Sequence, residues 1–276
     1  MSLVDKYMVV SYSSEIAFMD ELMRSPLKDN PLHNPAESLD KEIEKLVHED
    51  ATKYIIMLVF MVVLTLQEWW RWFFELKPNP IIVTAIAFIV IPYAVWKLYK
   101  FRLKLKNLRL GRDGEKAVGQ HLESLRESSA RVFHDIPASN FNLDHVVIAK
   151  SGIYVIETKT YSKPASGSPK IVFDGTTLRM NTGVKTDKPV IQVQAACRWL
   201  SDLLKQSTGK SFPVKSVIVF PGWFIEPTSE AKNSDVWVLN PKGLPTFISN
   251  SADRLSSDEV SMAAYHLSRY VRSYKA

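Results

Sequence analysis

The sequence has very little cysteine, since Cys197 is the only one among 276 residues. A single thiol excludes an internal disulfide and any zinc site that needs two or more thiolates from one chain. We therefore expect a reducing, cytosolic setting for the soluble part. The first 50 residues also lack the basic and apolar regions of a cleaved signal peptide, so we expect an anchored rather than a secreted protein.

Internal repeats and helix-turn-helix, RNA-recognition, zinc-finger and P-loop signatures are also lacking, so the sequence gives no support for direct base readout. Charge is unevenly distributed along the chain, and one region lacks acidic residues altogether. Residues 1–53 have six Lys or Arg against eleven Asp or Glu, whereas residues 97–110 have six cations and no acid. The net charge of +6 therefore arises entirely after the apolar region that separates these two segments.

Apolar residues are concentrated in residues 54–99. The run YIIMLVFMVVLTL (54–66) is short for a membrane span, but it becomes long enough when it is extended to a belt of tryptophans at positions 69, 70 and 72. The run IIVTAIAFIVIPYAVWKLY (81–99) is longer, and a short turn (75–80) joins the two. We predict a two-helix transmembrane hairpin that contacts the lipid bilayer; the alternative is a buried helical pair in a soluble domain.

Six cations follow directly after the second apolar run, in KLYKFRLKLKNLR (97–109). Positively charged flanks of a span stay in the cytoplasm. We therefore expect a multi-pass protein of the cell membrane, or of the inner membrane where there are two, with both its C-terminal domain and residues 1–53 in the cytoplasm. The same stretch could bind nucleic acid or anionic lipid, but a role in topology is sufficient to account for it.

Helical and strand periodicities alternate from residue 111 onward, which predicts an α/β fold with a mixed central sheet flanked by helices. The expected helices are 111–127, 189–206 and one near 258–273; the expected strands are 131–136, 143–150, 152–159, 215–221 and 235–240, with a hairpin in 170–180. We divide the chain into an acidic N-terminal segment (1–53), the transmembrane hairpin (54–99), a basic linker (100–110), a folded domain (111–250) and a C-terminal helix (251–276).

A carboxylate and an amine end the apolar strand GIYVIETK. Successive side chains of a strand alternate faces, so Glu157 and Lys159 share one face. Asp144 begins the preceding strand, and a tight turn at 150–152 makes the two strands antiparallel, so all three residues fall at the same end of the hairpin. Such a group can hold Mg²⁺ through oxygen ligands, and the lysine can stabilise charge on phosphoryl oxygens. A lone Glu-x-Lys is more often a solvated strand end.

Three motifs occur in order: GRDGE (111–115), DHVVIAKSGIYVIETKTYS (144–162) and PVIQ (189–192). Together they resemble the nuclease-related domain (NERD) family over about residues 111–225. That family is assigned to the PD-(D/E)xK nuclease superfamily, with a restriction-endonuclease-like fold. The resemblance implies an enzyme that hydrolyses phosphodiester bonds of nucleic acid, DNA being the expected substrate, with Mg²⁺ or Mn²⁺ as cofactor.

The resemblance also implies a role for each matching residue. Asp144 and Glu157 would be metal ligands, and Lys159 would be the catalytic lysine. Glu115 would be a third acid or a water-mediated ligand, and Gln192 a polar residue that faces the site. The superfamily's proline is absent, because Leu143 precedes Asp144. Outside the resemblance, the acid of the first helix could merely complement the helix dipole, and the glutamine could lie on a solvated face.

These observations favour a membrane-anchored, metal-dependent nuclease at the cytoplasmic face. The alternative is a non-catalytic, membrane-tethered nucleic-acid-binding or scaffold protein that retains the nuclease fold. A third interpretation is that the acidic segment and the hairpin carry the function while the domain recognises a partner. Basic residues near the candidate site could line a groove for a phosphate backbone: Lys163, Lys170, Arg179, Lys185 and Lys188.

Overall fold

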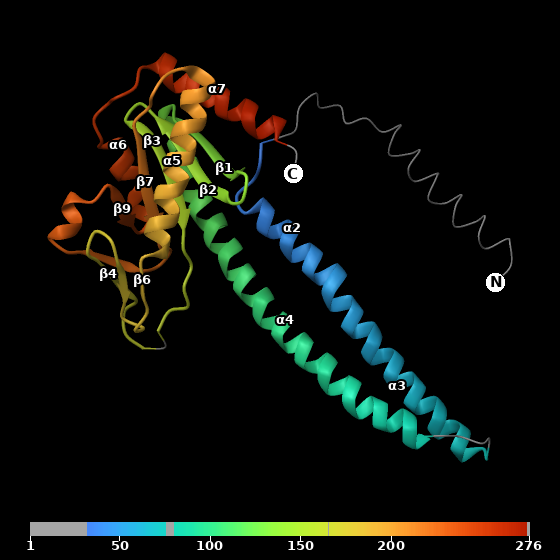
Figure 1. Cartoon of the computed structure of the whole chain (residues 1–276). Coiled ribbons are helices and arrows are strands. Elements are labelled where there is room, and N and C mark those ends of the chain that lie inside the picture. The colour runs from blue at the N-terminus through green and yellow to red at the C-terminus, as the bar shows by residue number, and fades with distance from the viewer. Residues whose placement is uncertain (1–31, 76–79, 165, 275–276) are drawn as a thin grey trace, which may run out of the picture.

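The computed structural model describes residues 32–75, 80–164 and 166–274 (Figure 1). Most of the expected acidic segment, residues 1–31, lies outside these ranges. The described part begins with helix α2 (Glu37–Lys45), which continues through a π-helical stretch (Leu46–Ala51) into α3 (Thr52–Phe73). Figure 1 shows α2 and α3 as one nearly continuous rod that runs antiparallel to α4 and projects from the α/β domain.

Helix α4 (Pro80–Glu123) is a single helix of 44 residues. It contains the second apolar run, the basic stretch and the first helix expected for the domain. The boundary drawn at residue 110 is therefore not a break in secondary structure. The stretch 97–110 is rich in Lys, Arg and Leu, which favour helix, and it contains neither Gly nor Pro. A 3₁₀ turn (Ser124–Ser128) then ends the helical path.

One helix in the described part of the chain, Ile81–Glu127, is long and apolar enough to cross a membrane. Its most apolar window has a mean hydropathy of 2.2, and 11% of that window is buried. Helix α3, which carries the first apolar run, does not reach this standard; Glu68 and Arg71 follow the run as an ion pair at 3.0 Å. The structure thus shows a helical hairpin with exposed apolar side chains such as Phe60 and Phe88, and two membrane spans remain a prediction.

The central sheet is mixed, as the sequence predicts, with strand order β1-β2-β3-β7-β9. Strands β1 to β3 are antiparallel neighbours, whereas β7 and β9 run parallel to β3. Every residue of β3 is buried, so the strand that carries Glu157 lies at the centre of the domain. The strands are β1 (Arg131–Pro137), β2 (Asn142–Ala149), β3 (Gly152–Thr158), β7 (Val214–Val219) and β9 (Val236–Leu239).

A second, four-stranded mixed sheet, in the order β6-β5-β4-β8, was not expected. Its β4–β5 hairpin is the one predicted in 170–180, where Asp174 accepts the N–H groups of Thr176 and Thr177. The hairpin pairs with β8 rather than with the central sheet, and β8 is short and ends in proline, so its pattern is weak. The strands are β4 (Lys170–Phe173), β5 (Leu178–Met180), β6 (Lys185–Thr186) and β8 (Phe224–Pro227).

Helices cover both faces of the central sheet. Helices α5 (Lys188–Thr208) and α7 (Ser257–Ser273) pack on one face, and the C-terminal part of α4 with α6 (Leu244–Ser249) packs on the other. Successive side chains of β3 point to opposite faces of the sheet. Val155 therefore packs in the core beneath α5 and α7, and Ile156 packs in the core beneath α4 and α6. The result is a mixed α/β fold with two helical layers.

Candidate active site at the end of strand β3

The β2–β3 hairpin brings Asp144 to the end of β3. Ala149 pairs with Gly152 and His145 with Ile156, so a two-residue turn fixes the register. One step beyond the last of these pairs, the N–H of Thr158 donates to Oδ2 of Asp144 at 2.7 Å. The structure therefore places Asp144 at the same end of the hairpin as Glu157 and Lys159, the arrangement that the sequence predicts.

Glu157 and Lys159 form a partly buried ion pair. Lys159 Nζ donates to Oε1 of Glu157 at 2.6 Å, and the side chain of Glu157 is only 4% exposed. The backbone N–H of Lys159 also donates to the carbonyl of Val219 at 3.0 Å, which extends the pairing of β3 with β7. The lysine is therefore held on both its main chain and its side chain.

Glu115 reaches the same place because α4 passes very close to the end of β3. A Cβ atom at Gly114 would overlap the side chain of Thr160, so the contact depends on glycine. Burial, together with the negative charges of Asp135 and Glu157, raises the pKa of Glu115 to about 8. The acid of the GRDGE motif is thus electrostatically part of the cluster.

The carboxylates at this site repel one another. Burial, followed by the charges of Glu157 and Glu115, raises the pKa of Asp144 well above its usual value. Burial also raises the pKa of Glu157, although Lys159 acts in the opposite direction. Three acids beside one ammonium leave an excess of negative charge, which a cation would relieve.

All five residues implied by the family resemblance line one open cavity of about 490 Å³. Gln192 reaches it from the first turns of α5, where its side chain is exposed. The lining also includes Asp135, Asn142 and Phe141 from β1, β2 and the loop between them. The cavity therefore lies where α4, α5 and the carboxyl end of β3 meet.

The sequence did not predict that the N-terminal helix would border this cavity. Ser38 and Leu39 of α2 line it, and the N–H and hydroxyl of Ser38 donate to the carboxylate of Asp135 at 2.5 and 2.8 Å. Asn142 donates to the same carboxylate at 3.0 Å. No local signal in the sequence indicates that an acid almost 100 residues away accepts the N–H and hydroxyl of Ser38.

Two histidines near the site lie outside the cavity lining. His134 and His145 approach each other through their Nδ1 atoms at 2.8 Å, and Nε2 of His134 lies 3.0 Å from Glu123. Both rings are buried, and burial lowers the pKa of each. His145 is therefore placed in the core, on the opposite face of β2 from Asp144.

The carboxylates of this cavity meet part of what a divalent cation requires of its ligands. Within the described ranges, no group of three or more His, Cys, Asp or Glu side chains is arranged as a metal site. Asp144 and Glu157 nevertheless supply two carboxylates, one partly buried and one buried. One or two carboxylates, completed by waters and substrate phosphates, are the usual protein ligands of Mg²⁺. The chemistry of these donors and their excess negative charge fit a hard divalent cation.

Residues 110–221 match the family model of the nuclease-related domain (NERD). The matched segment covers less than half of the chain. It contains all five candidate residues, and the resemblance drawn from the motifs is confirmed over this range. The description of the matched family, a nuclease-related domain, agrees with the set of residues that lines the cavity.

Two further comparisons are more limited. An uncharacterized protein of Bacillus anthracis is 37% identical over 65 residues, which are 22% of this chain and 31% of that protein. The chain thus matches about a third of the length of that curated relative. The structure of Pyrococcus furiosus SfsA in complex with Ca²⁺ is similar with a TM-score of 0.23 and 18% identity, over 45% of this chain and 52% of that one; this likeness is too low to support an argument.

Proposed function

We propose that the chain is a metal-dependent nuclease that hydrolyses phosphodiester bonds of nucleic acid, DNA being the expected substrate. The observation that carries the proposal is the convergence of Asp144, Glu157 and Lys159 in one cavity, with Glu115 and Gln192 on its walls. This arrangement supports a restriction-endonuclease-like site of the PD-(D/E)xK type. Leu143 is fully buried in the core, so the residue that replaces the superfamily's proline serves packing.

Each residue has a chemical role in this proposal. Asp144 and Glu157 would hold Mg²⁺ or Mn²⁺, which when bound would polarise a phosphoryl oxygen and favour ionisation of the attacking water. Lys159 donates to the developing charge on the phosphoryl oxygens. Glu115, whose pKa is raised to about 8, accepts a proton from water more readily than an ordinary carboxylate does. The amide of Gln192 orients the phosphate at the mouth of the cavity.

The basic residues expected to contact the phosphate backbone are not equally available. Lys170 forms an ion pair with Glu226, and Arg179 pairs with Asp174 at 3.2 Å. The remaining three cations, Lys163, Lys185 and Lys188, form no ion pair with any residue that the structure describes. We therefore assign nonspecific, salt-sensitive contacts with nucleic acid to these three.

We also propose that residues 54–99 anchor the domain in a lipid bilayer. Large apolar side chains are exposed along both α3 and α4, and the basic stretch follows directly. Because α2 contacts Asp135 of the domain, the chain enters and leaves the hairpin on the same side, which supports two spans and a cytoplasmic domain. A topology reporter fused to the C-terminus should be active only in the cytoplasm; activity outside it would contradict this orientation.

A non-catalytic, membrane-tethered nucleic-acid-binding protein remains the second candidate. The observation that favours it is that, among the described residues, no group of three or more His, Cys, Asp or Glu side chains is arranged to hold a metal ion. The test compares binding and cleavage of single- and double-stranded DNA and of RNA by the full chain in detergent. An enzyme loses cleavage but keeps binding when Asp144 is changed to alanine, whereas a binding protein shows no cleavage at all while it binds.

A further inference from the structure

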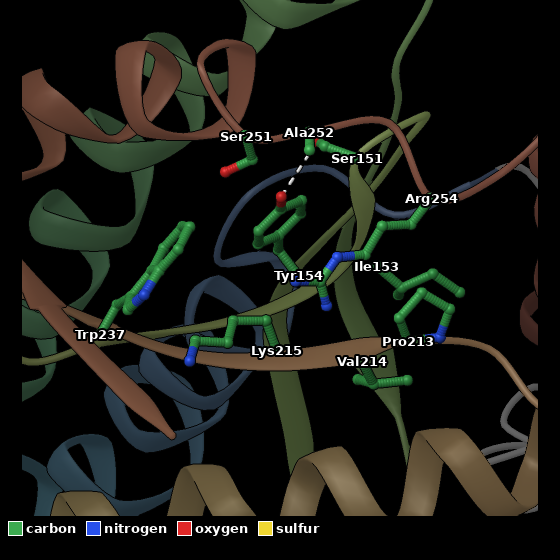
Figure 2. A pocket seen from close by; sticks show the side chains of 11 residues that line it. Ser151, Ile153, Tyr154, Pro213, Val214, Lys215, Trp237, Ser251, Ala252 and Arg254 are labelled. Carbon is green, nitrogen blue, oxygen red and sulfur yellow. Dashed lines mark hydrogen bonds between the residues drawn. The ribbon is translucent and has the colours of Figure 1, made fainter. Parts of the chain in front are cut away.

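A second cavity lies at the opposite end of the central sheet from the candidate active site (Figure 2). It has a volume of about 230 Å³ and opens beside the first residues of β3 and β7. Because β3 carries the active-site residues at its other end, six residues on, the two cavities lie roughly 20 Å apart along the strand. The side chains that matter are Tyr154, Lys215, Trp237, Ser251 and Arg254.

Two cations share this cavity. Lys215 extends from β7, and Arg254 reaches in from the loop before α7 (Figure 2). Neither side chain forms an ion pair with a carboxylate in the described part of the chain. Burial lowers the pKa of Lys215, the exposed Asp235 raises it in part, and Arg254 lowers it by a smaller amount. An anion between the two cations would relieve their repulsion.

Aromatic rings form another wall. The rings of Trp237 and Tyr154 lie 5.6 Å apart with an interplanar angle of 32°, and Lys215 Nζ lies 5.4 Å from the centre of the Trp237 ring. The hydroxyl of Tyr154 donates to Ser151 at 3.0 Å, and Ser151 donates in turn to the carbonyl of Ile248 at 3.1 Å. These hydrogen bonds hold Tyr154 in place, and the ammonium of Lys215 lies beside the ring of Trp237.

We propose that this cavity binds a nucleoside monophosphate, with its phosphate between Lys215 and Arg254 and its base against Trp237. A phosphate monoester carries nearly two negative charges at neutral pH and matches two cations that form no ion pair within the described part of the chain. A purine or pyrimidine ring can stack on an indole. Nothing in this assignment depends on the nuclease activity, because the residues involved lie apart from Asp144 and Glu157.

The experiment is calorimetric titration of the full chain in detergent with adenosine 5′-monophosphate, inorganic phosphate and adenosine. The monophosphate should bind at one site per chain, about tenfold more tightly than phosphate because base stacking adds to the charge contacts. Added salt should weaken its binding. Equal affinity for phosphate and the monophosphate, or absence of binding by the monophosphate, would overturn the proposal.

Three variants locate the binding. Arg254→Ala removes an exposed side chain whose backbone N–H, bonded to the carbonyl of Lys150, is unaffected, so the fold should persist. Lys215→Gln retains most of the stem that lies beside Trp237. Each variant should bind the monophosphate at least tenfold more weakly, whereas Lys205→Ala, which removes an exposed lysine of α5, should bind like the wild type. Unchanged affinity in the first two variants would assign the binding elsewhere and contradict the proposal.

Discussion

The carboxylate of Asp144 on β2 accepts the backbone N–H of Thr158 on β3 at 2.7 Å. This bond holds an acid in place at a point where its charge is repelled by Glu157 and Glu115. A core built only for stability would not gather three acids beside one lysine, because unpaired buried charge is costly. The arrangement is the kind expected where repulsion is retained for binding or chemistry.

Asp144→Asn should stabilise the protein when divalent cations are chelated. The amide oxygen can still accept the N–H of Thr158, while the repulsion by Glu157 is removed. We expect the melting temperature in EDTA to rise by about 2–4 °C. Asp253→Asn is the matched control, because it changes an exposed carboxylate and should leave the melting temperature unchanged. A lower melting temperature for Asp144→Asn would show that repulsion among these carboxylates does not destabilise the fold.

Acid should destabilise the fold through His134 and His145. Their pKa values are lowered by burial from the usual 6.5, so the folded state binds fewer protons than the unfolded state. This contribution is fully present above pH 6.5 and is lost as the pH falls toward the folded-state values. The acids at the site, whose pKa values are raised, bind more protons in the folded state and therefore stabilise the fold in acid. The test must therefore compare the pH dependence of stability in a histidine variant with that in the wild type. His134→Gln should lose less stability than the wild type between neutral and mildly acidic pH in urea titrations; equal losses would count against it.

Cys197 should be unreactive in the folded protein. Burial raises the pKa of its thiol to about 11, and Ser216 Oγ donates to its sulfur at 3.0 Å. Compared with an ordinary cysteine, the thiolate fraction at pH 8 should be lower by about a hundredfold. A thiol-specific chromogenic reagent should therefore label the native chain slowly and the urea-unfolded chain at once. Rapid labelling of the native chain would contradict this.

Asp135→Ala should release α2 from the rim of the active-site cavity. The substitution removes the acceptor of two bonds from Ser38 and one from Asn142, and we expect a loss of about 1–3 kcal/mol in the free energy of unfolding. Hydrogen exchange in Glu37–Lys45 should accelerate. Asp202→Ala, which removes an exposed acid on α5, is the control. If exchange in α2 stays the same, the bonds to Asp135 do not hold the helix.

Much of the domain was predictable because its signals are local. The two-residue turn after Ala149 and the alternation along β3 fix the register, and the register alone brings Asp144 to Thr158. The family motifs then supplied Glu115 and Gln192, which no local pattern links to the site. The helix expected over 189–206 is α5, and its first turns carry Gln192 to the cavity.

What the sequence did not predict depends on contacts between distant segments. The bonds of Ser38 to Asp135 join residues 97 positions apart, and neither residue type is unusual in its own segment. The unbroken course of α4 through residue 110 was missed because a change in composition was read as a change in structure. The pairing of β4 with β8 was missed because short parallel partners leave no periodicity.

The most direct test of the account is single-turnover cleavage of end-labelled linear DNA and of circular DNA by the full chain in detergent, with Mg²⁺, Mn²⁺ or EDTA. The wild type and Asp253→Asn should cut with either cation and not with EDTA. Asp144→Asn and Lys159→Ala should cut at least a hundredfold more slowly while binding the same DNA. Cleavage that persists in EDTA, or that is unaffected by both substitutions, would contradict a nuclease site built on Asp144, Glu157 and Lys159.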